Sequence, residues 1–569
     1  MITRLRIVGV IFGIFFVALI ARLFYWQVIH ASELSIEGRS QYQSQAKKAA
    51  RRGSILASDE SWLVSDADAY LVYAEKPKLT ETARAIANKL APLFVMDPTN
   101  HDELLKEAER LEGVLNQDGV WFPLKHKVSS DLKNNIAALK IAGIGFDEED
   151  TRSYPEGSSG AQVVGFVGKD DAGDDKGYFG LEGYYDLVLS GKPGFTLRES
   201  DVKGVPILFG ASKELSAVAG VDLLTHIDKR IQMTIEKKLK DGIDLYGAKS
   251  GTVILMDPKT GGIMGMASYP SYDPAKYWEY KTDDYKNPAV TDTFEPGSIF
   301  KPIIMAAALD DKSVEPDTKC DICSGPFKVD KYTIETWNNE YHPDSTMTDV
   351  IVNSDNVGMT YVGNKLGADK LYDYLDKFGF GHTTGIDLQG EVTPQIRNKG
   401  SWNIVDLATT TFGQGIAVTP IQVLRAIGAI ANGGKLVTPQ IVSRLQKDSW
   451  GQDIKPLTTV DVISEKASEQ IRDMMVAAID RGEAKWAAPK GFKIAGKTGT
   501  AQIPVAGHYD PTKTIASFVG FAPADNPKFV MIVILHEPTS SIWGSETAAP
   551  LWFDIAKDLF PYLGIQPGS

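Results

Sequence analysis

The stretch Glu295-Pro296-Gly297-Ser298-Ile299-Phe300-Lys301 decides how the second half of this chain is interpreted. A Pro-Gly turn precedes Ser298, and the apolar run Ile303-Ile304-Met305-Ala306-Ala307-Ala308 follows Lys301. The pattern predicts a helix that starts at Ser298. Because positions i and i+3 of a helix share one face, the Lys301 amine could reach the Ser298 hydroxyl.

This pair is a candidate nucleophile and base. A serine hydroxyl needs a base beside it to attack at neutral pH, and a buried lysine can lose its proton and serve as that base. The simpler interpretation makes Ser298 a helix N-cap. The same spacing occurs in Ser130-Asp131-Leu132-Lys133, where no chemistry is evident. The spacing alone therefore establishes nothing.

Composition limits the classes of function. A chain of 569 residues is suited to roughly two to four domains. The hydrophobic content of 43% and the charged content of 23% are typical of globular proteins. A net charge of −13 argues against a nucleic-acid partner. The eight histidines are scattered without a His-Glu-x-x-His pair, so we expect neither a catalytic zinc ion nor another cofactor.

The N-terminus predicts a membrane anchor. Arg4 and Arg6 precede an apolar stretch over residues 7–29, interrupted by Arg22. The stretch is long enough to cross a bilayer, and Tyr25-Trp26 is typical of an interface. Basic residues ahead of the stretch predict a cytoplasmic N-terminus, with the bulk of the chain outside the cell membrane. A small-x-small ending is lacking, which favours an uncleaved single-pass anchor over a cleaved signal peptide.

The two cysteines form the sequence Cys320-Asp321-Ile322-Cys323. Outside the membrane a disulfide is permitted. The spacing also occurs in redox and zinc sites, and His342 and Asp321 are the nearest further ligands. A loop disulfide or free thiols are favoured, and a metal site is the alternative.

Periodicity predicts an α+β fold. The pattern from 79 to 115 is largely helical, 162–168 reads as a strand, and 211–219 reads as a linker. A helix follows with Ile231, Ile235, Leu239 and Ile243 on one face. A hairpin is expected over 252–267, helices over 421–431 and 467–479, and strands over 492–500, 515–521 and 529–536. Strands at both ends with helices between predict a central antiparallel sheet.

The predicted domains are residues 1–29, a cytoplasmic tip and transmembrane anchor, then 30–220, and finally 221–569, which carries the chemistry. The boundary at 220 follows from the predicted linker.

Two further motifs follow Ser298 in order: Ser354-Asp355-Asn356 and Lys497-Thr498-Gly499-Thr500. Each is weak alone, since Lys259-Thr260-Gly261 repeats part of the second. The combination of Ser-x-x-Lys, Ser-x-Asn and Lys-Thr-Gly in this order is specific for acyl transfer by a serine.

The residue types fit that chemistry, which needs a nucleophile, a proton path and oxyanion donors. Ser298 is the predicted nucleophile, and Lys301, alone or through Ser354, is the predicted proton path. Backbone amides of Ser298 and Thr500 are the predicted oxyanion hole. The predicted substrate-binding residues are Asn356 for an amide, Lys497 for a carboxylate, and Thr498, Gly499 and Thr500.

One motif match is rejected. Residues 491–498 fit the phosphate-loop pattern G-x-x-x-x-G-K-T, which requires a strand followed by a helix. Phe492-Lys493-Ile494 alternates like a strand, and residues 499–504 do not favour a helix. A nucleotide site is therefore not expected.

With these motifs the chain resembles the class B penicillin-binding proteins, which are envelope-anchored peptidoglycan D,D-transpeptidases. Further segments resemble the family: Arg51-Arg52-Gly53-Ser54-Ile55, Arg152-Ser153-Tyr154-Pro155-Glu156-Gly157, Gly180-Leu181-Glu182, residues 222–232, residues 268–274, Thr411-Phe412-Gly413-Gln414-Gly415 and Val418-Thr419-Pro420. The chain departs from the family at Asp355, where a second serine is common, and in the loop of the two cysteines.

The resemblance implies an extended pedestal similar to a dimerisation domain at 30–220 and a penicillin-binding transpeptidase domain at 221–569. It implies stem peptides ending in D-Ala-D-Ala as substrates, β-lactams as inhibitors, and a membrane glycosyltransferase with divisome or elongasome proteins as partners. Residues 177–194 and 354–358 resemble the division branch somewhat more. A β-lactam sensor, a non-catalytic scaffold and a hydrolytic relative are the alternatives.

Overall fold

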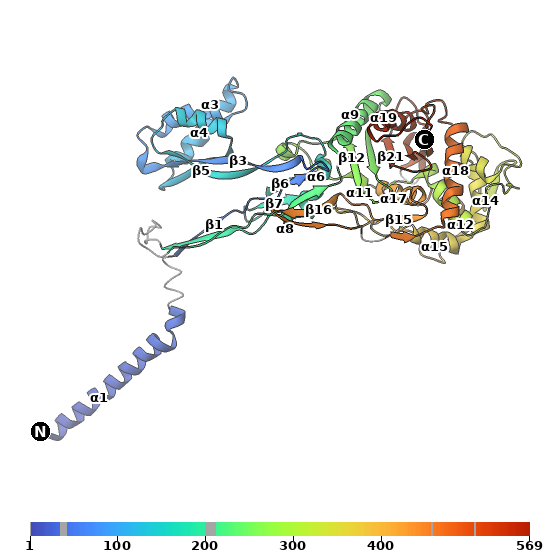
Figure 1. Ribbon diagram of the computed structural model, residues 1–569. Coiled ribbons are helices and arrows are strands. Elements are labelled where there is room, and N and C mark those ends of the chain that lie inside the picture. The colour runs from blue at the N-terminus through green and yellow to red at the C-terminus, as the bar shows by residue number, and fades with distance from the viewer. Residues whose placement is uncertain (1, 35–42, 200–211, 457–458, 506–507, 569) are drawn as a thin grey trace. The chain divides into compact units, whose positions relative to one another are not determined.

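The computed structural model describes residues 2–34, 43–199, 212–456, 459–505 and 508–568. The chain divides into two compact units (Figure 1). One comprises Met1–Arg52 and Ser190–Gly220, and the other comprises Gly53–Leu189 and Val221–Ser569.

The first unit contains the apolar N-terminal helix and a small sheet. Helix α1 (Ile2–Phe24) continues into the π-helical turn η1 (Tyr25–Ile29), and together they form the one helix among the described residues that is long and apolar enough to cross a membrane. Strands β1 (Gln43–Lys48), β8 (Gly194–Glu199) and β9 (Ser212–Leu215) form an antiparallel sheet in the order β1-β8-β9.

The prediction of a linker over 211–219 is wrong in part, because this range contains strand β9. Ala211 lies outside the described residues, but Ser212–Leu215 pairs with β8. The small and polar residues of this segment do not predict a strand. Its structure depends on backbone pairing with β8 and not on an apolar face.

The second unit begins with a seven-stranded mixed sheet, of which three antiparallel strands are covered by helices. The long strand β3 (Trp62–Glu75) pairs with β4 (Trp121–Val128) and β5 (Ile144–Ser153). Helices α3 (Ala83–Phe94) and α4 (His101–Asn116) pack on the sheet with α5 (Ser130–Ala138), which confirms the helical pattern predicted for 79–115. Ser130 and Lys133 lie on α5, where the Lys133 ammonium stands 3.7 Å from the Tyr70 ring centroid.

The strand predicted over 162–168 is only half correct. Residues Ala161–Val164 form the short helix α6, and Phe166–Lys169 form strand β6, which pairs with β7 (Asp175–Tyr178). Gly165 separates them with φ +79°. A short buried apolar run does not reveal by periodicity alone whether it is helix or strand.

A buried ion cluster joins four segments of this unit. Arg152 donates to the Asp66 carboxylate at 2.8 Å, to the Glu182 carboxylate at 2.7 Å and to the Gly53 carbonyl at 2.7 Å. The side chains of Arg152, Asp66 and Glu182 are 5%, 8% and 0% exposed. Gly53, Arg152 and Glu182 each belong to a segment that resembles the penicillin-binding protein family in sequence. These three segments therefore meet at the Arg152 guanidinium.

The catalytic-motif region is built on a five-stranded antiparallel sheet in the order β12-β11-β21-β20-β19. Alternate residues of β11 and β21 belong to two separate apolar clusters, so both faces of the sheet are covered. Helices α9 and α19 pack on one face, and α17 packs on the other with the buried helix α12 behind it (Figure 1). The predicted α+β class with a central antiparallel sheet is confirmed.

The strand bounds are β10 (Asp222–Thr225), β11 (Ser250–Met256), β12 (Ile263–Tyr269), β16 (Val442–Lys447), β17 (Trp450–Asp453), β19 (Ala495–Val505), β20 (His508–Ala522) and β21 (Phe529–His536). The helix bounds are α9 (Lys229–Tyr246), η4 (Gly297–Phe300), α12 (Lys301–Asp310), α13 (Met347–Val352), α14 (Asn356–Leu366), α15 (Ala368–Lys377), α16 (Ile404–Thr411), α17 (Pro420–Ala431), α18 (Glu465–Arg481) and α19 (Ala548–Tyr562). The smaller elements are β2 (Ile55–Leu56), η2 (Lys76–Lys78), α7 (Gly180–Tyr184), α8 (Asp186–Leu189), η3 (Pro274–Glu279), α10 (Thr282–Tyr285), α11 (Pro288–Thr291), β13 (Phe327–Val329), β14 (Tyr332–Ile334), β15 (Lys435–Val437) and β18 (Thr459–Asp461).

The strand predicted to start at Phe492 starts later, at Ala495. The Phe492 ring stacks on Phe560 with centroids 4.3 Å apart, so it serves as a packing residue before the strand. Lys497 and Thr498 lie inside β19 and not at a helix start, which agrees with rejecting the phosphate loop.

We expect Arg152→Met to destabilise the chain, because it leaves two buried carboxylates without their cation. Removing one partner of a buried ion pair costs about 3–5 kcal/mol. Guanidinium unfolding followed by tryptophan fluorescence measures the change. Arg84→Met is the matched control, since Arg84 pairs with Glu112 at 2.6 Å on the surface and should matter little. Equal losses in the two variants would contradict a structural role for the cluster.

Candidate active site

Ser298 lies on a turn that is held from behind by a glycine-rich loop. The turn η4 begins at Gly297 and leads directly into α12, so a helical start beside Ser298 is confirmed, with one 3-10 turn first. Gly297 has φ +56° and donates its N–H to the Gly413 carbonyl at 3.0 Å. A Cβ on Gly413 would stand 2.2 Å from the Gly297 carbonyl oxygen. Glycine at 413 is therefore what lets this loop support the serine.

Glu295 connects the same turn to two other segments. Its carboxylate accepts from the Gly415 N–H at 3.0 Å and from the Tyr509 hydroxyl at 3.1 Å. Burial raises the pKa of Glu295, and burial with the nearby Glu295 charge raises the pKa of Tyr509 to about 12. At physiological pH the Tyr509 phenol is therefore neutral and can donate to Glu295.

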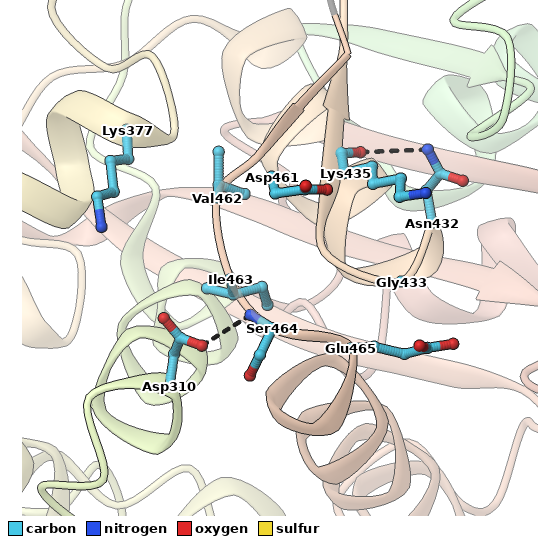
Figure 2. A pocket seen from close by; sticks show the side chains of 10 residues that line it. All are labelled: Asp310, Lys377, Asn432, Gly433, Lys435, Asp461, Val462, Ile463, Ser464 and Glu465. Carbon is cyan, nitrogen blue, oxygen red and sulfur yellow. Dashed lines mark hydrogen bonds between the residues drawn. The ribbon is translucent and has the colours of Figure 1, made fainter.

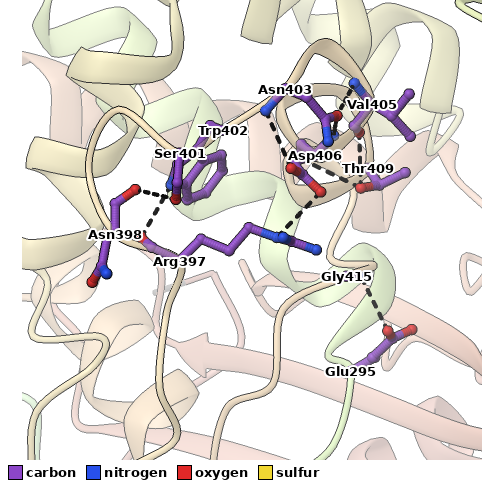
Figure 3. A network of polar contacts seen from close by, with 10 residues as sticks. All are labelled: Glu295, Arg397, Asn398, Ser401, Trp402, Asn403, Val405, Asp406, Thr409 and Gly415. Carbon is purple, nitrogen blue, oxygen red and sulfur yellow. Dashed lines mark hydrogen bonds and ion pairs between the residues drawn. The ribbon is translucent and has the colours of Figure 1, made fainter.

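A polar network orders the chain that leads to Gly415. Figure 3 shows Arg397 reaching Asp406 at 3.2 Å and Asn403 capping the first turn of α16. The Trp402 indole N–H donates to the Arg397 carbonyl at 3.1 Å. Since α16 ends at Thr411, this network fixes where the supporting loop begins.

Ser354 stands in a tight turn between α13 and α14. Its φ of +56° is unusual for a residue with a side chain, and it is 4% exposed. Asp355, where the sequence departs from the family pattern, accepts from the Val357 N–H at 2.8 Å and the Gly358 N–H at 3.1 Å. It is the N-cap of α14, a task that serine and aspartate share.

Lys301 is fully buried and points at this turn. Its Nζ donates to the Ser354 carbonyl at 2.5 Å and to Asn356 Oδ1 at 2.8 Å, and it lies 3.3 Å from Ser354 Oγ. Among the described residues Lys301 has no hydrogen bond to Ser298, so the direct contact predicted from the spacing is absent. Burial, and then the Lys497 charge, hold the pKa of Lys301 well below its usual value.

The third motif lies on β19, the edge strand beside η4. A Cβ on Gly499 would stand 2.8 Å from Ile299 Cγ2 and 2.5 Å from Ser517 Oγ, so glycine lets the strand approach the serine turn. Lys497 is 3% exposed, and its Nζ donates to the Thr498 hydroxyl at 3.1 Å. Burial lowers the pKa of Lys497.

One pocket brings these segments together. It has a cavity volume of about 90 Å³, and its lining includes six predicted site residues: Ser298, Ser354, Asn356, Thr498, Gly499 and Thr500. Lys301 and Lys497 lie behind the lining, joined to it through their hydrogen bonds to Asn356 and Thr498. All eight predicted residues are therefore in the pocket wall or in direct contact with it.

The pocket lining also contains residues that the sequence did not predict as site residues. Besides Gly297, they are Trp337, Phe412, Gln414, Glu483 and Trp543. Phe412 and Gln414 belong to residues 411–415, a segment that resembles the family but for which the sequence predicts no function. Trp337 and Trp543 meet edge to face with centroids 5.1 Å apart, and Thr500 Oγ1 accepts from the Gly544 N–H at 2.9 Å, which holds that loop. Nothing local in the sequence marks the tryptophans or Glu483.

A larger hollow of about 550 Å³ lies at the other ends of α12 and α18, and none of the predicted site residues lines it. Figure 2 shows its mixed charges, with Lys377 and Lys435 among carboxylates. Asp310 accepts from the Ser464 N–H at 2.7 Å and so ties the end of α12 to the start of α18.

The two cysteines form a disulfide, Cys320–Cys323. This is one of the two favoured alternatives, and it occupies both sulfurs, so the zinc alternative with Asp321 and His342 is wrong. Within the described ranges, no group of three or more His, Cys, Asp or Glu residues could hold a metal ion.

The order of the motifs and their meeting at one pocket agree with comparisons to known proteins. Residues 251–560 match the penicillin binding protein transpeptidase domain, and residues 47–225 match the penicillin-binding protein dimerisation domain. The chain belongs to the class B penicillin-binding proteins. The predicted boundaries at 29 and 220 remain predictions.

Similar proteins match most of the length of this penicillin-binding protein. Stage V sporulation protein D of Bacillus subtilis is 36% identical over 499 residues, 84% of this chain and 77% of that protein. Peptidoglycan D,D-transpeptidase FtsI of Escherichia coli K12 is 29% identical over 80% of this chain and 74% of that protein. The crystal structure of Mycobacterium tuberculosis penicillin binding protein 3 with aztreonam has a TM-score of 0.70 and 25% identity, and covers 92% of this chain and 98% of that chain.

We expect Gly413→Ala to slow acylation by a penicillin about 100-fold, because the methyl group would displace the serine turn, and a shift near 1 Å costs about this much. Labelling of the full chain with a fluorescent penicillin measures the rate. Gly433→Ala is the matched control: Gly433 also has positive φ, at +66°, but its Cβ would meet open space. If both variants label like the unchanged chain, the loop does not position the turn.

Proposed function

We propose that this penicillin-binding protein is a serine-type peptidoglycan D,D-transpeptidase in which Ser298 attacks a stem peptide ending in D-Ala-D-Ala. The observation that carries the proposal is the convergence of three distant motifs on one pocket, with a buried lysine of lowered pKa behind it. β-Lactams would acylate the same serine and are expected inhibitors.

The hydrogen bonds of Lys301 support a proton route through Ser354. A neutral amine has two hydrogens and one lone pair. The Ser354 carbonyl and Asn356 Oδ1 can only accept, so they take both hydrogens. The lone pair then faces the Ser354 hydroxyl at 3.3 Å, which can donate to it. Ser354 thus connects the base to the pocket, and Lys301 need not touch Ser298 in the free protein.

The reaction balances without any further group. The Ser298 oxygen bonds to the penultimate D-Ala carbonyl carbon, and its proton passes to Lys301. The terminal D-Ala leaves as an amine that takes this proton back through Ser354. An amine of a neighbouring stem peptide then attacks the ester, forms the crosslink and returns a proton to Ser298.

The remaining predicted residues have complementary roles. Lys497, with Thr498, receives the carboxylate of the terminal D-Ala, and Asn356 binds a substrate amide. The backbone amides of Ser298 and Thr500 stabilise the oxyanion, which needs donors fixed in advance. The close approach of β19 to η4 at Gly499 supports this assignment.

The location and partners follow from the anchor and the family. The apolar helix holds the chain in the cell membrane with its N-terminus in the cytoplasm and the pocket outside. A membrane glycosyltransferase supplies the glycan, within the divisome or the elongasome, and the resemblance of residues 177–194 and 354–358 to the division branch favours the divisome. A sensor or an inactive scaffold is the alternative, and the buried Lys301 is the observation against a scaffold, because an unused site has no reason to bury an amine.

We expect Ser298→Ala to abolish labelling by fluorescent penicillin and crosslinking of lipid-linked glycan with a partner polymerase, because both need the ester at this oxygen. The full chain in detergent is the sample, and covalent label on a gel is the measurement. If Ser298→Ala still carried the label, Ser298 would not be the nucleophile. An unchanged chain that labels but does not crosslink would favour the sensor.

We expect Ser354→Ala to slow acylation about 10²–10⁴-fold, the usual range for general acid–base catalysis, because it removes the hydroxyl from the proton route. Stopped-time labelling gives the rate. Ser468→Ala, a fully buried serine on α18 that donates to the Ile430 carbonyl, controls for loss of stability. Full activity of Ser354→Ala would leave Lys301 as a direct base.

A further inference from the structure

The C-terminal end of α18 brings to the pocket a carboxylate that no motif predicts. Helix α18 packs against α12, α13 and β19, which carry or precede the three motifs. It ends at Arg481, and a Cβ on the next residue, Gly482, would lie 2.3 Å from the Ala478 carbonyl oxygen of the same helix and 3.0 Å from the Val352 carbonyl oxygen. This close approach to α13 places the next residue, Glu483, in the pocket lining with Ser354.

Charged groups face this end of α18 from each element packed around it. Lys301 on α12 and Lys497 on β19 are both buried, and Glu483 is half-buried. The other charged groups nearby have partners of their own or face solvent: Asp355, which caps α14, Arg481, which lies 3.5 Å from Asp349 of α13, and Lys485, which is exposed.

Glu483 acts on both buried lysines. Burial lowers the pKa of Lys497, and the Glu483 charge is the influence that raises it. Burial and the Lys497 charge lower the pKa of Lys301, while Asp355 and Glu483 raise it. Among the described residues Glu483 has no hydrogen bond or close ion pair, so its charge acts through space. Of the two lysines, Lys301 is the one displaced far below its usual pKa.

We propose that Glu483 is a positioning residue that keeps the positive charge on Lys497 while Lys301 stays neutral. The inference rests on the proposed function, in which the two lysines need opposite protonation states. Two ammonium groups in one buried site would repel each other strongly. A carboxylate at the pocket rim offsets one charge, and because it forms no fixed contact it leaves the Lys497 ammonium available to the substrate carboxylate.

The test is the pH dependence of acylation by a penicillin, measured on the full chain in detergent. The acid limb of the profile reports loss of the neutral Lys301 amine, and the alkaline limb reports loss of the Lys497 ammonium. Removing a nearby anion destabilises both ammonium forms, so Glu483→Gln should move both limbs to lower pH by about one unit. Glu483→Asp keeps the charge and should restore both limbs.

Glu465→Gln is the matched control, since it removes a carboxylate from the opposite end of α18 and should leave the profile unchanged. A uniform fall in rate at every pH, or limbs that stay in place in Glu483→Gln, would overturn the proposal. The proposal would also be overturned if Glu483→Gln slowed only the release of bound acyl groups, because Glu483 would then activate water.

A methyl ester of the penicillin, which lacks the carboxylate, should show no alkaline limb with any of these chains. A persistent alkaline limb would mean that Lys497 does not act through the ligand carboxylate, and would overturn the inference. Failure of the proposed function is recognised separately, by labelling of Ser298→Ala.

Discussion

The burial of one amine is the constraint on which the rest of the site depends. Lys301 is 0% exposed, and its Nζ ties the first turn of α12 to the turn between α13 and α14 through the Ser354 carbonyl and Asn356. A charged amine at this depth would be costly, so the protein holds Lys301 in an environment that favours its neutral form. Burial and the nearby Lys497 charge lower its pKa, while its hydrogen bonds hold Ser354 beside it. The depth of Lys301 in the fold therefore sets both its position and its reactivity.

Close backbone approach is the second device that builds the pocket. Glycines at 413 and 499 stand where a Cβ would collide with a neighbouring segment, and a Cβ on Gly482 would make a tight contact with the Val352 carbonyl oxygen at 3.0 Å. They bring a loop, the end of α18 and the edge strand β19 to the serine turn. Since β19 is an edge strand, its outer side is open to the pocket rather than paired within the sheet. Rigid helices and a covered sheet supply the surrounding order, as sites with strict geometry require.

Much of this arrangement was predictable from the sequence, and the reasons for the remainder are physical. The apolar face of α9, the β11–β12 hairpin and the strands of the third motif repeat regular periods, so periodicity finds them. Strand β9 and helix α6 were misread because pairing and packing with distant segments decide their structure. The motif residues could be named in advance, but the contact of Lys301 with Ser354 instead of Ser298 depends on a turn 53 residues away. Glu483 and the two tryptophans reach the pocket only through tertiary packing, which no local pattern records.

The backbone of Ser354 limits how this protein can change. With φ at +56°, a serine pays a conformational penalty of about 1 kcal/mol that glycine or asparagine would largely avoid. Those replacements would relieve the strain but delete the hydroxyl. The proposed proton route needs this hydroxyl, so a replacement that relaxes the turn would stabilise the fold and lose activity at the same time.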